Sequence, residues 1–276
     1  MPKHTILAVD DEVEILELYR KVFNASPASD FDVFADSSAE ELSAVLECRT
    51  YSDPEKLLEE YCREVEQGIH HPLCIVDMKM PLHAEGLETA GKLREIDPDI
   101  DIVFCTANSK IVPEEIHARL RERVFFVLKP PNIEEFTVMV RSLVDYWQSR
   151  QDLRRETAFL ERLLESVPDL ILMKDSKGIY MTCNKTFARF AKRAPEEIIG
   201  GSDCDFLPPE LCRTFLEQDI QVMESGRPLT YEQSVEHPDG GWCVLETVKS
   251  PVFAKNGECI GLIGIARDIT NRSQKE

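Results

Sequence analysis

Five short apolar segments in the first half of the chain, separated by stretches with helical periodicity, limit the possible fold more than any other feature. They are residues 4–10, 31–35, 72–77, 101–106 and 124–128. Apolar runs of this length are typical of buried strands, and strands that alternate with helices form parallel sheets with helices on both faces. We therefore expect residues 1–131 to form a doubly wound α/β domain with a five-stranded parallel sheet.

The connection between the second and third of these segments is unusually long. It contains a helix start at Asp53 and Pro54 and a helix stop at Gly68. This punctuation predicts an extra or extended helix between the two strands.

A long segment without glycine follows the predicted α/β domain. Apolar residues recur in it at the spacing of a coiled coil, at Leu143, Tyr146, Leu153, Leu160, Leu164 and Val167, although Arg150 and Thr157 occupy the same seam. We predict that residues 132–166 form a connecting helix that pairs with a copy of itself. The alternative is an amphipathic helix that packs on its own domain.

The pattern changes again after Pro168. Two strands surround the turn Asp175–Gly178, helical segments follow, and three strands are then joined by turns at 238–241 and 255–257. This order predicts an α+β domain over residues 167–271, with a five-stranded antiparallel sheet whose helices are grouped in the middle of the sequence.

Composition limits the possible functions and the cellular location of the protein. The chain carries 51 acidic and 32 basic residues, a formal charge of −19, which disfavours broad contact with nucleic acid phosphates. No apolar run approaches the roughly 20 residues that a membrane helix requires, and the N-terminus lacks a signal-peptide pattern. We expect a cytoplasmic protein without a membrane partner. The nine cysteines include no C-x-x-C pair, so we interpret them as mostly buried thiols.

Polar residues stand where the strands of the first domain end: Asp10, Asp11, Asp77, Thr106 and Lys129. They should converge at the carboxyl edge of the parallel sheet, where ligands of such folds bind. Three carboxylates placed together favour Mg²⁺, which prefers oxygen ligands. A lysine and a threonine opposite them can hold the oxygens of a phosphoryl group. We therefore expect one of the carboxylates to be a phosphoryl acceptor.

The segments ILAVDDE, IVDMKMP, FCTAN and VLKP resemble the signature segments of two-component receiver domains, which have a flavodoxin-like fold. The resemblance implies that Asp77 is the phospho-acceptor and that Mg²⁺ is held by Asp10, Asp11, Asp77 and the backbone carbonyl of Lys79. It also implies that Thr106 and Lys129 bind the phosphoryl group and that Phe126 is the switch aromatic. Ala107 is small and leaves room for the phosphoryl group.

The sequence departs from the receiver pattern in two places. The segment between Asp11 and Asp77 is longer than usual, and residues 82–85 replace a short turn that more often bears Gly and Asp. These departures change the surfaces beside the pocket and leave its chemical positions intact. Lys79 and Asn108 flank the route of an attacking water and could tune the lifetime of the phosphate.

The C-terminal segments SVPDLI, CNKTFARF, EEIIGGSD and GIARDIT resemble a PAS domain. Such domains bind small molecules in some members and mediate pairing in others, so the cofactor-binding residues stay unknown. Residues 208–226 contain no histidine for haem. Cys204 lies in a frame similar to that of flavin photosensors, but its neighbours and Ala266 differ from the residues that hold flavin, so we expect neither cofactor.

These features together predict a two-component phosphorelay protein whose receiver accepts a phosphoryl group and signals through the helix to the PAS domain. It would be a switch and not an enzyme, with a sensor histidine kinase or phosphotransfer protein as partner and a homodimer as its assembly. One alternative is a ligand-sensing PAS protein with a secondary receiver. Another is the N-terminal regulatory part of a larger kinase or cyclic-dinucleotide enzyme. A haloacid dehalogenase phosphatase is disfavoured because Lys79 occupies the position of its second aspartate.

Overall fold

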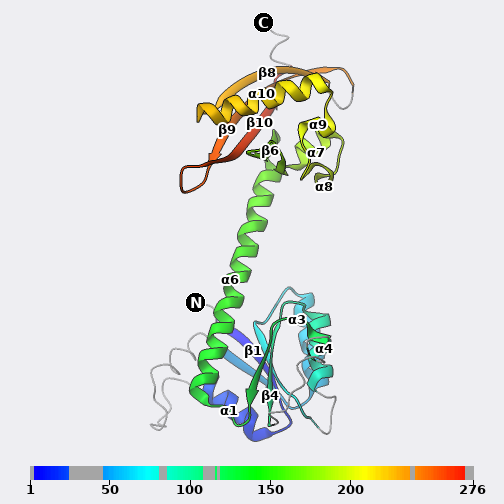
Figure 1. The fold of residues 1–276 in the computed structure, drawn as a ribbon. Coiled ribbons are helices and arrows are strands. Elements are labelled where there is room, and N and C mark those ends of the chain that lie inside the picture. The colour runs from blue at the N-terminus through cyan, green and yellow to red at the C-terminus, as the bar shows by residue number, and fades with distance from the viewer. Residues whose placement is uncertain are drawn as a thin grey trace. The chain divides into compact units, whose positions relative to one another are not determined.

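A computed structural model describes residues 3–24, 46–80, 86–107, 116, 119–236 and 240–270. The chain divides into two compact units, Met1–Arg154 and Arg155–Glu276. Each unit contains one five-stranded sheet (Figure 1). The two units are described separately.

The sheet of the first unit is parallel throughout. Its strands are β1 (His4–Val9), β2 (Leu46–Tyr51), β3 (Leu73–Asp77), β4 (Asp101–Thr106) and β5 (Val124–Leu128). They are arranged in the order β2-β1-β3-β4-β5, and every neighbouring pair is parallel. This arrangement fits a flavodoxin-like, doubly wound fold.

The second strand differs from the prediction. The segment 31–35 lies outside the described residues, and the strand that pairs with β1 is Leu46–Tyr51. The helix α3 (Pro54–Glu66) begins at Asp53 as predicted, and the Asp53 side chain accepts a hydrogen bond from the Glu55 backbone N–H. Because it connects β2 to β3, α3 is the ordinary crossover of the fold and not an extra helix.

Helices cover both faces of this sheet (Figure 1). One face packs against α1 (Val13–Phe23) and the first part of α6 (Ile133–Ser166), and the other packs against α3 and α4 (Gly86–Ile96). The residues of β1 alternate between the two cores, since Ile6 and Ala8 face the first pair of helices and their neighbours in the strand face the second. Such apolar burial on both faces explains why the strands read as continuous apolar runs.

The helix α6 confirms the long uninterrupted helix expected after residue 131. Asn132 caps its start by accepting hydrogen bonds from the backbone N–H groups of Glu134 and Glu135. Its first part follows the alternative prediction of packing on its own domain, with these residues in the core of the first unit: Phe136, Val140, Leu143 and Val144. Because of this packing, the compact first unit includes the first part of the helix and extends to Arg154.

The second unit contains an antiparallel sheet with its helices grouped in the middle of the sequence, as predicted. Its elements are β6 (Leu170–Asp175), β7 (Tyr180–Cys183), α7 (Lys185–Ala191), α8 (Pro195–Ile198), α9 (Asp203–Phe206), α10 (Pro209–Ser225), β8 (Leu229–Glu236), β9 (Trp242–Phe253) and β10 (Cys259–Asp268). The strand order is β7-β6-β10-β9-β8, and all neighbouring pairs are antiparallel.

Two sets of local hydrogen bonds, in a turn and at a helix cap, shape the start of this unit. In the turn between β6 and β7, the Asp175 side chain accepts hydrogen bonds from the backbone N–H groups of Lys177 and Ile179, and Gly178 supplies a φ of +82°. The buried Asn184 caps α7 and also donates to the backbone carbonyl of Asp169. These contacts fix the end of β7 against the start of β6.

The cysteines correct one expectation. Cys48, Cys74, Cys105 and Cys243 are buried free thiols as predicted, but Cys62 is exposed. Cys204 and Cys212 are joined in a disulfide.

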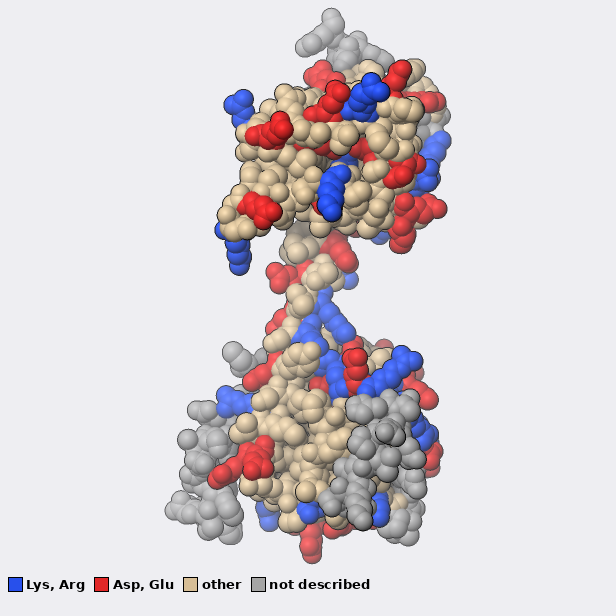
Figure 2. Space-filling view, in the orientation of Figure 1, with Lys and Arg blue, Asp and Glu red and all other residues tan. Residues whose placement is uncertain are grey.

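Charged side chains of both signs are interspersed over the face that Figure 2 shows. Within the part of the chain that the structure describes, no helix is both long and apolar enough to cross a bilayer.

Candidate functional site

The carboxyl edge of the parallel sheet gathers the polar residues that the sequence placed there. Asp10 follows β1, Asp77 and Thr106 are the last residues of β3 and β4, and Lys129 follows β5. The Lys129 ammonium nitrogen lies 2.8 Å from Asp10 Oδ2 and 3.1 Å from Asp77 Oδ1. Asp10, Asp77 and Thr106 are at most 4 % exposed. The site is therefore a buried cluster of charges in which one lysine contacts two aspartates, beside a buried threonine.

Backbone hydrogen bonds set the spacing of these side chains. The pairing of the strands continues just past their ends, where Asp10 N–H donates to the Tyr51 carbonyl and Lys129 N–H donates to the Thr106 carbonyl, at 3.1 and 2.9 Å. The Met78 N–H donates to the Cys105 carbonyl at 3.0 Å. The sheet thus holds the site residues in place before any ligand binds.

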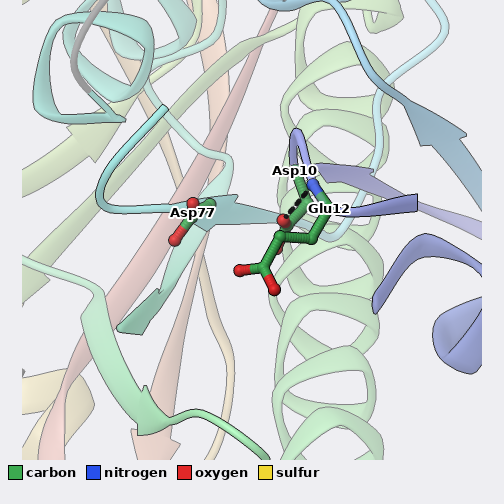
Figure 3. A group of neighbouring side chains, drawn as sticks. All are labelled: Asp10, Glu12 and Asp77. Carbon is green, nitrogen blue, oxygen red and sulfur yellow. Dashed lines mark hydrogen bonds between the residues drawn. The ribbon is translucent and has the colours of Figure 1, made fainter. Parts of the chain in front are cut away.

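The acidic group at this edge differs from the predicted one in one member. Carboxylate oxygens of Asp10, Glu12 and Asp77 lie within 4.8 Å of one another, whereas Asp11 is not in this close group (Figure 3). Glu12 turns toward the site because its backbone N–H donates to Asp10 Oδ1 at 3.0 Å and its carboxylate lies 2.9 Å from the Lys129 nitrogen. Asp11 acts at longer range, as one of the charges that raise the pKa of Asp77.

Burial dominates the electrostatics of the site. It raises the pKa of Asp10 and of Asp77 above the ordinary range of an aspartate, against the lowering effect of Lys129. Burial alone would lower the pKa of Lys129, but its ion pairs with Asp10, Glu12 and Asp77 outweigh that effect and raise the pKa. Three carboxylates around one ammonium leave an excess of negative charge at the edge of the sheet.

An open pocket of about 310 Å³ gives access to Asp77. It is lined by Glu12, Asp77, Lys79, Thr106, Ala107 and Lys129. Five of these six were predicted as site residues, and Glu12 is the addition. The pocket therefore exposes the predicted acceptor together with the lysine and the threonine that would hold a phosphoryl group.

The residues present fit a divalent cation. The buried Asp10 Oδ2 accepts no well-aligned hydrogen bond within the described residues, although the Lys129 nitrogen lies near it. The close carboxylates and the excess negative charge are the oxygen-rich environment that Mg²⁺ prefers. Asp10, Glu12 and Asp77 would hold the ion. The assignment of Asp11 and of the Lys79 carbonyl as ligands stays a prediction.

Two neighbours complete the site. Phe126, the predicted switch aromatic, is partly buried on β5 and stacks on Phe104 with ring centroids 5.8 Å apart. Gly86, at the start of α4, passes so close to Asp77 that a Cβ on it would lie 2.0 Å from the Asp77 carbonyl oxygen. Glycine is therefore required next to the predicted acceptor. Asn108 and residues 82–85 lie outside the described residues.

The second unit contains a buried charge cluster that the sequence did not reveal. It consists of Lys174 on β6, Lys249 on β9, Asp203 on α9 and Asp219 on α10, each at most 6 % exposed. Lys174 contacts Asp203 and lies 2.8 Å from Asp219, while Lys249 lies 2.5 Å from Asp219. The Tyr180 hydroxyl donates to Asp203 at 2.6 Å. The two lysines and two aspartates balance one another inside the unit.

The sequence does contain a signal that could have predicted this cluster, namely charged residues within apolar segments. Lys174 stands in the apolar strand segment LILMKD, and Lys249 stands in VLETVKSPV. Asp219 lies two turns after the buried Cys212 on α10, on the same helical face. In each case the strand or helix periodicity places the charged residue among core positions. A buried charge needs a partner, so this placement predicts ion pairs inside the core.

Comparisons with known proteins bear on the second unit. The family model of the PAS fold matches residues 164–274. These residues form a PAS domain, as the sequence predicted. Two solved PAS structures are similar to this chain. The PAS domain of a Colwellia psychrerythraea protein is 25 % identical with a TM-score of 0.37, and the match covers 44 % of this chain and 99 % of that one. The PAS domain of Bordetella pertussis BvgS is 22 % identical with a TM-score of 0.38, and the match covers 44 % of this chain and 91 % of that one.

Curated relatives are signalling proteins by name. The aerobic respiration control sensor protein ArcB of Escherichia coli (strain K12) is 28 % identical over 120 residues, which are 44 % of this chain and 15 % of ArcB. The methanogenesis regulatory histidine kinase FilI of Methanothrix harundinacea is 27 % identical over 143 residues, 51 % of this chain and 16 % of FilI. The chain thus spans about 15 % of ArcB's length. These similarities support a role in signal transduction.

Proposed function

We propose that the first unit is a receiver domain and that Asp77 accepts a phosphoryl group in a two-component phosphorelay. The observation that carries this proposal is the position of Lys129, whose ammonium lies 3.1 Å from Asp77 and which, like Asp77, lines an open pocket. Buried lysine, threonine and carboxylates at one sheet edge suit the transfer of a charged phosphoryl group.

The proposed transfer uses few groups. An Asp77 carboxylate oxygen attacks phosphorus, an acyl phosphate forms, and the bond from phosphorus to the donor breaks. The donor would be the phosphohistidine of a sensor kinase or phosphotransfer protein. Lys129 would pair with one phosphoryl oxygen, and the Thr106 hydroxyl would donate to another. A bound Mg²⁺ would neutralise charge on the phosphoryl oxygens.

Acetyl phosphate with Mg²⁺ tests this function directly. The intact mass of the parent should rise by one phosphoryl group, and chelation of the metal should abolish the change. Asp77→Asn should remain unlabelled. Glu88→Gln removes an exposed carboxylate of α4 that pairs with Lys92, and it should be labelled like the parent. Labelling of Asp77→Asn at the parent's rate contradicts the proposal.

Two further variants decide the metal ligands. If Glu12 holds the ion, Glu12→Gln should raise the Mg²⁺ concentration needed for labelling more than Asp11→Asn does, because Glu12 belongs to the close acidic group. The opposite order would support the ligand set implied by the receiver resemblance.

We also propose that the second part of α6 pairs with a second copy of the chain. Leu143 is buried in the first unit and Arg150 bonds to Asp101, so these two positions of the seam are already in use. Further along, Leu153 and Leu160 are 65 % and 53 % exposed. An apolar stripe of this kind on a helix is stabilised by a matching stripe.

The mass in solution tests this pairing. The parent should be a dimer, and Leu153→Asp/Leu160→Asp should be a monomer. Arg162→Asp changes a residue on the opposite side of the helix from Leu160 and should leave the dimer intact. A parent that stays monomeric at high concentration, with and without beryllofluoride, refutes the pairing but leaves the phosphoryl transfer untouched.

A further inference from the structure

One pair of cysteines in the PAS domain differs from the other cysteines of the chain. Cys204 on α9 and Cys212 on α10 form a disulfide, with their Cα atoms 5.1 Å apart. This separation is within the range that a disulfide spans without backbone movement. The remaining seven cysteines are free thiols. The backbone geometry of this pair therefore permits bond formation.

The two sulfurs differ in their access to solvent. Cys204 is exposed, whereas Cys212 is only 4 % exposed. A reagent in solution therefore reaches Cys204 first, and Cys212 is placed to react with Cys204 afterwards. This combination of one accessible and one resolving cysteine is typical of thiol pairs that open and close.

The disulfide also joins the two helices that supply both carboxylates of the buried charge cluster. Asp203 directly precedes Cys204 and bonds to Lys174 and to the Tyr180 hydroxyl. On α10, Asp219 contacts Lys174. The bond between the sulfurs thus ties α9, a helix of four residues, to the long helix beside it.

We propose that Cys204 and Cys212 are a reversible redox-modification site that exchanges with low-molecular-weight disulfides of the glutathione class. The Cys204 thiolate attacks one sulfur of the oxidised reagent, which forms a mixed disulfide and releases one reduced thiol. The Cys212 thiolate then attacks Cys204, which forms the intramolecular disulfide and releases a second reduced thiol. Two cysteine thiols are oxidised, one reagent disulfide is reduced, and the two protons pass to the released thiols.

Reduction removes the covalent link between α9 and α10 but leaves the charge cluster in place. We therefore expect the segment 203–212 to open more often in the reduced protein. Its backbone amides should exchange hydrogen at least several-fold faster, while those of β9 and β10 should change less.

The full chain in buffers of reduced and oxidised glutathione tests the proposal. Free thiols are blocked with one alkylating reagent, disulfides are reduced, and the released thiols are labelled with a second reagent before peptide mass spectrometry. Cys204 and Cys212 should change label together and reversibly with the glutathione ratio. Cys212→Ser should instead accumulate glutathione on Cys204, because the resolving thiol is missing. Cys62→Ser, at an exposed free cysteine, is the matched control and should not alter the transition.

The parent protein alone can overturn the proposal, so the folding of the variants does not limit the test. Two thiols that stay reduced at every glutathione ratio, a bond that reduced glutathione does not open, or a bond between two chains in place of one within a chain would each refute it.

Discussion

Replacing Lys174 with methionine tests the buried charge cluster of the PAS domain. Lys174 is 2 % exposed and contacts both Asp203 and Asp219. After Lys174→Met, Asp219 keeps Lys249, but Asp203 loses the cationic partner that the described residues provide and keeps only the Tyr180 hydroxyl. Leaving a buried carboxylate without its partner lowers the free energy of unfolding by about 3–5 kcal/mol.

A second substitution makes the reasoning specific. Asp203→Asn removes the unpaired charge while its side-chain oxygen can still accept from Tyr180. We therefore expect Lys174→Met/Asp203→Asn to be more stable than Lys174→Met by about 1–3 kcal/mol. If the two substitutions only caused independent packing defects, the second would lower the stability further instead of restoring it.

Urea denaturation read by hydrogen exchange and mass spectrometry of peptides from residues 167–270 gives the stability of this domain apart from the first unit. Lys185→Met, at a lysine that is 73 % exposed in its pair with Glu165, is the control and should change stability by no more than about 0.5 kcal/mol. A loss below about 1 kcal/mol for Lys174→Met, or no recovery in the double variant, would refute the argument.

Three further predictions concern other parts of the chain. The purified protein should show neither a Soret band nor flavin absorption, because residues 208–226 contain no histidine and the neighbours of Cys204 and Ala266 differ from the residues that hold flavin; either spectrum contradicts this. Gly86→Ala should lower the free energy of unfolding by about 1–3 kcal/mol and slow the labelling of Asp77, because its Cβ would lie 2.0 Å from the Asp77 carbonyl oxygen; Gly91→Ala, whose Cβ would be 3.7 Å from the nearest side chain, should be harmless, and equal effects of the two would be evidence against the reasoning. Burial raises the pKa of Glu64, but its hydrogen bonds to Arg49 and His71 outweigh burial and lower this pKa overall. The contribution of Glu64 to stability is therefore present above about pH 4.5 and is lost as the pH falls through the lowered pKa. Glu64→Gln should therefore cost about 1 kcal/mol at pH 7 and much less near pH 3 in urea titrations, and a loss that is the same at both pH values would contradict it.

The sequence predicted most of the fold because its apolar periodicity is strong. β1, β3 and β4 are largely buried apolar runs, and β5 is an apolar run of mostly half-buried residues, so these four strands stand out from their surroundings. The strand Leu46–Tyr51 was missed because it pairs only with β1 at the edge of the sheet, and exposed or half-buried polar residues interrupt its buried ones. Its neighbours along the chain have a composition typical of helices, which obscured the short strand.

The candidate site was predicted residue by residue because strand ends converge at one edge of a parallel sheet. The presence of Glu12 in the close acidic group, which the sequence analysis did not predict, shows the limit of that argument. The turn after β1, where Asp10 accepts from the Glu12 backbone, decides which side chain points inward, and no periodicity describes such a turn. The cysteine bond and the charge cluster were missed for a similar reason, since both depend on contacts between segments that are distant or irregular.

The balanced charges in the PAS domain also restrict how its sequence can change over evolutionary time. A mutation that neutralises Lys174 or Asp219 leaves Asp203 or Lys249, respectively, buried without its ionic partner, and loss of either end member leaves an unbalanced buried charge, so single steps away from this arrangement pass through a less stable intermediate. Stable departures require compensating changes, such as an apolar residue at 174 together with an uncharged residue at 203. Descendants of this chain should therefore keep the four charges or lose them in opposite pairs, and that paired pattern would be visible as covariation among related sequences.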